Sequence, residues 1–453
     1  MSTSALHPAA DARGPIDRLL GLFSEVRSGE GVRALLMLVN VFLILVCYYI
    51  LKTVREPLIL GTDVPEVLQR LGIHDTAEVK TYASAGQALL LMGFVPAYGW
   101  FASKVDRSKL VLGVTLFFVA NIVAFALGVG ANVEHIGVYL FIWVGIFSLM
   151  IIAQFWSYAN DSYTKEAGSR LFPIIAIGST LGSPLGAWIT ARMFEARLRP
   201  DVMLYLAAFL LLLTAGLFLP IDRSGSLSQK AVANDAPLGG KSGFALVFAS
   251  PYIRLIALLL VLLNVVNTTG EFILSHRVTV RADALLAAES GFDKKAFIGA
   301  FYGDYFFWVN VAALVLQGFV ASRLVKRFGL AGVLFALPLI AIGSYGIIAL
   351  GASLAVVRWA KTAENSADYS VMNTAKQLMW LPTSRDEKYK AKQAVDAFFY
   401  RIGDLTAAAV VFIGTSWLSL GSRGFAIANL LFVGFWLLLA ARIVGENRRL
   451  SAQ

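Results

Sequence analysis

The sequence is poor in cysteine, histidine and charged residues. It has one cysteine, Cys47, which excludes an intramolecular disulfide and is interpreted as a small buried hydrophobe. The four histidines (His7, His74, His135 and His276) do not have the spacing of metal ligands. Only 15% of the residues are charged, against about a quarter in soluble domains. This shortage argues against an ordinary soluble protein.

Sequence motifs of catalysis are also missing. The chain has no HExxH, no GxSxG and no glycine-rich phosphate loop in a soluble βαβ unit. The first 30 residues contain neither a clean apolar core nor a small-residue cleavage site, so we predict no cleavable signal peptide. We therefore expect neither an enzyme nor a bound cofactor or metal ion.

Apolar residues, in contrast, make up 58% of the chain, with 31 Phe and 9 Trp. Twelve apolar segments have about the 20 residues that a helix needs to cross a bilayer. They are 34–60, 82–102, 110–130, 137–160, 171–191, 203–221, 251–275, 297–322, 329–350, 353–379, 394–418 and 424–443. The sequence therefore predicts an all-α membrane protein with twelve transmembrane helices in two pseudo-symmetric six-helix bundles.

The connections between these segments predict the domains and the orientation. We expect a cytoplasmic N-terminal tail (1–32), a first bundle (33–222), a cytoplasmic linker (223–246) rich in Ser, Gly and Lys, a second bundle (247–443) and a cytoplasmic C-terminal tail (444–453). For residues 16–26 two interpretations stay open, an amphipathic surface helix and a disordered tail. With the N-terminus inside, 22 Lys and Arg residues lie in inner connections and 10 in outer ones. The net charge of +10 thus reflects topology in the cytoplasmic (inner) membrane, and no nucleic-acid partner is needed.

The two halves of the chain look like repeats. The second segment of each half ends in a basic turn, GWFASKVDRSKLVLG from Gly99 and GFVASRLVKRFGLAG from Gly318. Segments five and eleven share an Ile-Gly step that ends at Gly178 and at Gly403, respectively. Parallel repeats of this kind build transporters with one site between the halves.

The first apolar segment carries charges that a membrane helix rarely keeps. Lys52, Arg55 and Glu56 precede the end of its apolar run. Each such charge costs about 2.5–3.5 kcal/mol at the centre of a membrane helix. Lys52 and Arg55 are three residues apart and share a helix face, which suits an anion if the chain supplies a polar cavity. The alternative is that Arg55 and Glu56 reach the outer headgroups.

Other polar residues fall within the predicted helices. They are Asn160, Asp161, Asn264, Asn267, Glu271, Asp304, Arg358, Lys361, Lys376, Arg401 and Asp404. Asp161 and Lys376 have an alternative reading as the cytoplasmic ends of their helices. Arg401 and Asp404, three residues apart, have an alternative reading as an internal ion pair.

Three stretches carry a family resemblance: YYILKTVREPLIL from Tyr48, FWSYANDSYTKEAGSRLFPIIAIGS from Phe155, and ADYSVMNTAKQLMWLPTSRDEKYKAKQAVDAFFYRIGD from Ala367. They resemble the ATP/ADP translocase family, the nucleotide transporters of plastids and obligate intracellular bacteria, with relatives in free-living bacteria. The resemblance implies a major-facilitator-like fold and the movement of nucleotides, often ATP against ADP with phosphate. It also implies that Lys52 and Glu271 are the family's helix-one lysine and helix-seven glutamate.

The resemblance extends to helices four, ten and eleven, with departures. Lys376 matches the lysine of the family's helix-ten Thr-Lys-Glu motif, although a glutamine follows it here. Asn160-Asp161 stands where the family has Asn-Glu in helix four. Asp404 stands where the family has a lysine in helix eleven, so a carboxylate would repel a triphosphate unless Arg401 or a counter-ion compensates.

We predict a secondary transporter that moves an anionic substrate by alternating access, with a nucleotide as the leading candidate, through ATP/ADP exchange or proton-coupled uptake. The candidate substrate-binding residues are Lys52, Arg55, Asn160, Asp161, Glu271, Lys376, Arg401 and Asp404. Lys52, Glu271 and Arg401 stand out because each has apolar sequence on both sides. The alternatives are a transporter of another organic anion, and a membrane scaffold or sensor that keeps the fold without transport. The expected partners are the small anion and the lipid bilayer, and the expected state is a monomer.

Overall fold

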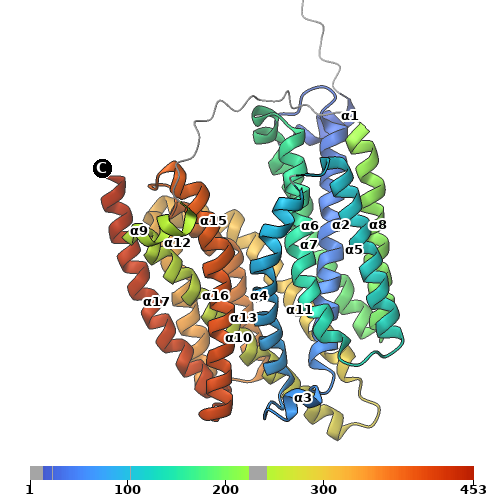
Figure 1. The fold of residues 1–453 in the computed structure, drawn as a ribbon, viewed down its shortest axis with the longest axis vertical. Coiled ribbons are helices and arrows are strands. Elements are labelled where there is room, and N and C mark those ends of the chain that lie inside the picture. Colours follow the sequence, from blue (N-terminus) through green and yellow to red (C-terminus); the bar gives the residue numbers. More distant parts are fainter. Residues whose placement is uncertain (1–13, 23, 103, 224–241, 453) are drawn as a thin grey trace, which may run out of the picture.

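The computed structural model describes residues 14–22, 24–102, 104–223 and 242–452 (Figure 1). These residues form helices joined by short turns, with no strand among them. The first half contains α1 (Pro15–Leu20), α2 (Gly31–Leu60), α3 (Glu66–Gln69), α4 (Thr76–Ala102), α5 (Arg107–Gly130), α6 (Ile136–Ser162), α7 (Lys165–Glu195) and α8 (Pro200–Arg223). The second half contains α9 (Gly243–Ala249), α10 (Pro251–Ala288), α11 (Lys294–Val315), η1 (Leu316–Ala321), α12 (Ser322–Ala349), α13 (Leu354–Ala367), η2 (Asp368–Met372), α14 (Asn373–Leu378), η3 (Glu387–Ala391), α15 (Lys392–Ala394), η4 (Val395–Phe399), α16 (Tyr400–Phe412), η5 (Ile413–Trp417) and α17 (Ser422–Ser451).

Helical structure covers each of the twelve predicted segments, so the all-α membrane fold class is confirmed. Among the described residues, ten helices are long and apolar enough to cross a membrane. One of them, Lys294–Ala349, contains two predicted segments and turns at Gly329, whose φ of 61° lies in the region that favours glycine. The predicted segment 353–379 is not among the ten and consists of α13, η2 and α14. The count of twelve crossings therefore stays a prediction.

The predicted tail and linker fall partly outside the described residues, namely at 1–13 and 224–241. In the stretch 16–26, for which two interpretations are open, the structure has a short helix, α1, that ends at Leu20. The Asp17 carboxylate of α1 accepts a hydrogen bond from the backbone N–H of Gly31 at the start of α2 (2.8 Å). At the other boundary, α9 begins at Gly243, four residues before the predicted start of the second bundle. The division into two domains stays a prediction.

The helices are arranged as two groups side by side, with most of the first half on the right of Figure 1, most of the second half on the left, and α4 and α11 between them. Helix α2 packs against α6, α7 and α8, and α10 packs against α16 and α17. Between the groups, α7 and α2 contact α11, and α4 contacts α16 and α10. Helix α1 and the C-terminal end of α17 lie at the same end of the molecule, which we call the termini end (Figure 1).

Glycines let helices approach closely at equivalent places in the two halves. The four-residue spacing of Gly178, Gly182 and Gly186 predicts close packing, and a Cβ on these residues would meet backbone oxygens of α2 at 2.2, 2.5 and 2.6 Å, respectively. A Cβ on Gly403 of α16 would lie 2.8 Å from a backbone oxygen of α10. The fifth segment thus packs on the first as the eleventh packs on the seventh. This match supports the repeat that the sequence predicts.

We expect the substitution Gly182→Ala to lower the stability of the protein by about 1–3 kcal/mol, because the added methyl group forces α7 away from α2. The matched control is Gly216→Ala on α8, where no atom lies within 4 Å of the added methyl group. Thermal melts of the two variants in detergent test the prediction. Equal melting temperatures would contradict the close approach of α2 and α7.

Hydrogen bonds and ion pairs join the two halves at the end of the molecule opposite to the termini end. His276 Nδ1 of α10 lies 2.5 Å from Asp75 Oδ2, just before α4. Arg192 of α7 donates to Asp304 of α11 (2.8 Å), and Thr415 of η5 donates to the Glu78 carboxylate of α4 (3.1 Å). These contacts hold the two halves together at the opposite end.

Candidate functional site

A cavity of about 610 Å³ lies between the two halves, within the usual size range of ligand sites, about 300–1,000 Å³. It is lined by Tyr48, Lys52, Arg55, Glu56, Lys80, Ser84, Gln87, Phe141, Gly145, Ser148, Leu149, Ile152, Ala153, Asn267, Thr268, Glu271, Phe306, Asn365, Tyr369, Tyr400 and Arg401. We call it the central cavity. Lys52, Glu271 and Arg401, the three strongest predictions from the sequence, come from α2, α10 and α16 and meet here.

Positive charge exceeds negative charge in the lining of the central cavity. The lining contains four cations, Lys52, Arg55, Lys80 and Arg401, and two carboxylates, Glu56 and Glu271. The Asp404 carboxylate next to Arg401 reduces the excess to one positive charge. Such a wall attracts an anion, and a low-dielectric site strengthens the attraction.

Lys52 differs from the other central cations in its partners. Within the described part of the chain it has no carboxylate within ion-pair distance, and its hydrogen bond is a long one to Tyr369 Oη (3.4 Å). The side chain is buried, with 8% exposed, and its ammonium reaches the central cavity. A buried cation without a counter-ion is costly. Lys52 is therefore the cation most available to an incoming anion.

Arg55, Glu56 and Lys80 form a buried cluster at one side of the central cavity. Glu56, with 1% exposed, forms an ion pair with Lys80 Nζ at 2.7 Å and accepts a hydrogen bond from Arg55 Nε at 3.2 Å. Lys80 Nζ also donates across the halves to Ser275 Oγ of α10 (3.0 Å). The alternative that Arg55 and Glu56 reach the outer headgroups is wrong, because Glu56 is paired inside the protein.

Glu271 of α10 is held by neutral donors. Its carboxylate accepts hydrogen bonds from Tyr305 Oη of α11 (3.1 Å) and from Asn365 Nδ2 of α13 (2.8 Å). Deeper in the second half, Lys361 and Glu364 of α13 form an ion pair (3.1 Å), and Tyr345 donates to Glu364 (2.8 Å). Both Lys361 and Glu364 are buried. Glu271 is thus the carboxylate of the second half that faces the central cavity.

Arg401 and Asp404 of α16 form the internal ion pair that their spacing suggests. Arg401 Nη1 lies 3.5 Å from Asp404 Oδ2, and Thr268 of α10 donates to Asp404 Oδ1 (3.1 Å). Arg401 lines the central cavity, whereas Asp404 lies behind it. The long ion pair leaves other guanidinium N–H groups of Arg401 available for a ligand.

Three predicted site residues lie elsewhere. Asn160 and Asp161 are exposed near the end of α6, and Asp161 pairs with Arg107 of α5. Lys376 of α14 pairs with Asp368 (3.2 Å) and does not line the central cavity. In this structure Asp161 and Lys376 agree with the alternative interpretation, helix ends with a structural partner. Their contact with a substrate stays a prediction.

Lys80 is a site residue that the sequence interpretation missed. In the sequence the second apolar segment begins at residue 82, and this start assigns Lys80 to an outer loop. In the structure α4 begins at Thr76, and Lys80 is buried, with 8% of the residue exposed. The error arises because Thr76–Lys80 is polar and shows no apolar run. Tyr369 was missed as well. It lies on η2, a π-helical turn inside a helix, and such turns often occur at functional sites.

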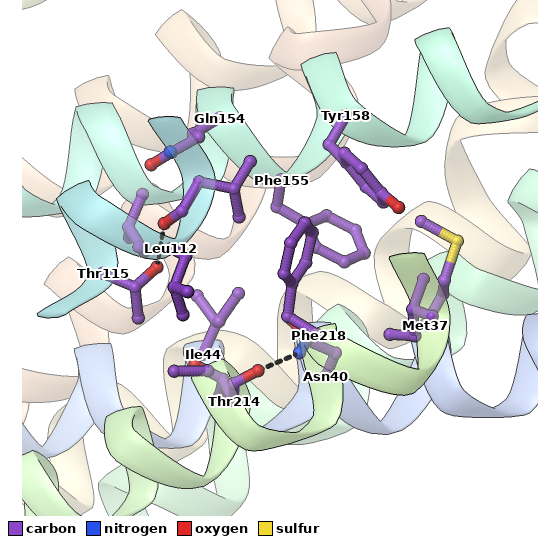
Figure 2. Close-up of a pocket in the computed structure, with 14 residues that line it drawn as sticks. Met37, Asn40, Ile44, Leu112, Thr115, Gln154, Phe155, Tyr158, Thr214 and Phe218 are labelled. Atoms are coloured by element: carbon purple, nitrogen blue, oxygen red, sulfur yellow. Dashed lines mark hydrogen bonds between the residues drawn. The ribbon is translucent and has the colours of Figure 1, made fainter. Parts of the chain in front are cut away.

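Figure 2 shows a second hollow, inside the first half, between α2, α5, α6 and α8. Its volume is about 20 Å³, enough for about one water molecule. Asn40 Nδ2 donates to the backbone oxygen of Thr214 beside it (2.8 Å), and Phe155 and Phe218 also line it (Figure 2). It is too small for an organic substrate. No group of three potential metal ligands occurs among the described residues.

The sequence is similar to those of known carrier proteins. No protein-family model matches the chain. The ADP,ATP carrier protein 1 of Chlamydia pneumoniae is 23% identical over 344 residues, which is 65% of this chain and 64% of the carrier. The ADP,ATP carrier protein 1 of Chlamydia trachomatis is 24% identical over 296 residues, which is 56% of this chain and 54% of the carrier. The matches thus span less than two thirds of the carriers.

Solved structures of transporters share the fold. The nucleoside transporter NupG superposes with a TM-score of 0.61 at 15% identity, covering 91% of this chain and 98% of NupG. The POT family transporter PepTSo gives a TM-score of 0.62 at 12% identity over 93% of this chain and 99% of its own. A bacterial homolog of the human lysosomal transporter Spinster, in an inward-facing and unoccupied conformation, gives 0.61 at 14% identity over 92% and 96% of the two chains. At these identities the likeness shows the fold alone.

Proposed function

We propose that this multi-pass membrane protein, a sequence relative of bacterial ADP,ATP carrier proteins with a major-facilitator-like fold, is a secondary transporter of an anionic substrate. The observation that carries the proposal is the excess of cations around the central cavity. The names of the relatives make a nucleotide the first candidate for the anion. Because those relatives are carriers, we propose transport in place of catalysis.

Lys52 and Arg401 bind the negatively charged part of the substrate in this proposal. One comes from each half, and both face the central cavity. Charge-assisted hydrogen bonds from an ammonium and a guanidinium suit phosphate or carboxylate oxygens. Glu271, already held by Tyr305 and Asn365, balances the charge of the cations when no substrate is bound.

Transport proceeds by alternating access of the central cavity to the two sides of the membrane. Support comes from the bonds that join the halves at the opposite end, such as the one between Asp75 and His276. The lining on α6 runs for about three turns, from Phe141 towards the termini end as far as Ala153. We assign the termini end to the cytoplasm and the protein, acting as a monomer, to the inner membrane.

The test is uptake by proteoliposomes that contain the purified protein and an internal nucleotide. Radiolabelled ATP, ADP, AMP and GTP are offered outside, with and without a pH gradient. We expect saturable uptake of at least one nucleotide. A pH gradient that drives uptake into empty vesicles indicates proton coupling, whereas a requirement for internal nucleotide indicates exchange. If none of the four is taken up or competes, the nucleotide proposal is wrong.

A second candidate is a transporter of a less charged organic anion. It is favoured by Asp404, which lies beside Arg401 and cancels part of the charge at the second half of the site. Dicarboxylates and sugar phosphates, added as unlabelled competitors at millimolar concentration, distinguish it from the first. Inhibition by these compounds but not by nucleotides would select the second candidate.

A further inference from the structure

The ammonium group of Lys52 lies among four aromatic rings. Its Nζ atom is 4.4 Å from the ring centre of Phe306, 5.1 Å from that of Tyr49, 5.6 Å from that of Tyr369 and 6.0 Å from that of Tyr48. All four distances lie within the range of a cation–π interaction. We call these four residues the aromatic cage. The rings of the cage thus stabilise the buried ammonium of Lys52, a role that a carboxylate plays for other buried cations.

Both halves of the protein build the aromatic cage. Tyr48 and Tyr49 belong to α2, whereas Phe306 belongs to α11 and Tyr369 to η2. Tyr49 Oη also donates to Asn310 Oδ1 of α11 (2.9 Å), and the rings of Tyr49 and Phe306 meet edge to face at 6.4 Å. The cage therefore exists in full only while α2 stays close to α11 and η2. Lys52 in the cage is a contact between the two halves.

A cage of rings holds a cation less firmly than an anion does. A cation–π contact is weaker than a charge-assisted hydrogen bond to a carboxylate or phosphate. The other buried cations nearby have such carboxylate partners, Lys80 with Glu56 and Lys361 with Glu364. Lys52 has only the rings and the long hydrogen bond to Tyr369. An anion that enters the central cavity can thus take the ammonium from the cage.

We propose that the aromatic cage is a latch that makes reorientation of the two halves depend on a bound anion. With the central cavity empty, Lys52 stays in the cage and holds α2 against α11 and η2. An anionic substrate withdraws the ammonium, the rings of Phe306 and Tyr369 lose their cation, and the halves separate at this level. Phe306 and Tyr369 are then positioning residues that favour exchange over movement of the empty protein. This inference rests on the proposed function, because it takes Lys52 as the substrate contact.

The test uses the variant Phe306→Leu, which removes the nearest ring and keeps an apolar side chain. Proteoliposomes are loaded with the labelled nucleotide that the wild-type protein takes up, and efflux is measured with and without the same nucleotide outside. We expect efflux without external nucleotide to rise about tenfold, which corresponds to the loss of one buried cation–π contact. We also expect the half-saturating concentration for exchange to fall, because the cage no longer competes for Lys52. If Phe306 had only a structural role, its replacement would not lower this half-saturating concentration.

The controls separate this inference from the proposed function. Phe307→Leu alters the next residue of α11, which is not part of the cage and contacts Trp308 instead. We expect Phe307→Leu to behave like the wild type. Tyr369→Leu removes a ring on a different helix and should repeat the effect of Phe306→Leu if that variant does not fold. Wild-type protein that moves no anion refutes the proposed function. Wild-type exchange with unchanged efflux in both ring-removal variants refutes the latch alone.

Discussion

Replacing Lys52 by glutamine should nearly abolish nucleotide uptake while leaving the protein folded. Removing one partner of a buried charge contact costs about 2–5 kcal/mol in binding, which is more than tenfold in affinity. The fold should tolerate the change, because Lys52 has no carboxylate partner within the described residues that would be left unpaired. Uptake kinetics and a thermal melt of the same preparation measure both effects.

The matched control for this variant is Lys109→Gln. Lys109 is an exposed lysine on α5 that does not line the central cavity, so its loss removes the same charge from the same half of the chain. We expect uptake to stay within about twofold of the wild type. Equal loss of uptake in both variants would mean that the positive charge of the whole protein, and not a contact in the central cavity, attracts the substrate.

Replacing Lys80 by methionine should have the largest effect on stability. Lys80 is the ammonium that lies 2.7 Å from Glu56 Oε2, and Glu56 is almost completely buried. Removing one member of a buried ion pair costs about 3–5 kcal/mol, because the buried Glu56 carboxylate then keeps only its longer contact with Arg55 (3.2 Å). The change also breaks the hydrogen bond to Ser275 across the halves. Thermal melts in detergent should show a lower melting temperature and less folded protein.

A double variant shows whether the cause is the loss of the ion pair between Lys80 and Glu56. In Lys80→Met with Glu56→Gln the buried carboxylate becomes a neutral amide whose oxygen still accepts from Arg55, so most of the lost stability should return. The exposed pair of Arg70 and Glu66, with 81% and 87% of their side chains exposed, supplies the control. Arg70→Met should change stability by less than about 1 kcal/mol. No recovery in the double variant would show that Lys80 acts through its hydrogen bonds to Ser275 (3.0 Å) and to Tyr302 Oη (3.4 Å) rather than through Glu56.

The sequence was informative about the central cavity at three charges that stand inside apolar runs. Lys52, Glu271 and Arg401 have apolar neighbours on both sides, and all three line the cavity. The interpretation failed where a polar residue lies near the end of a segment. Asp161, near the end of α6, pairs with Arg107, whereas Lys80, in a polar first turn, belongs to the site. Near the end of a segment a charge costs little to insert, whether it belongs to the site or only pairs at a helix end. Hydropathy therefore cannot distinguish these two roles.

By itself the sequence determined that this is an all-α membrane protein of repeated halves with buried cations, because hydropathy, segment length and the cost of a buried charge are local properties of the chain. Only the tertiary structure decided which charges are satisfied. Glu56 pairs with Lys80 of another helix, Asp404 partly neutralises the charge of Arg401, and Lys52 lies among aromatic rings from both halves. Such partners are far apart along the chain, and only the packing of the helices brings them within the few ångströms over which hydrogen bonds and cation–π contacts act.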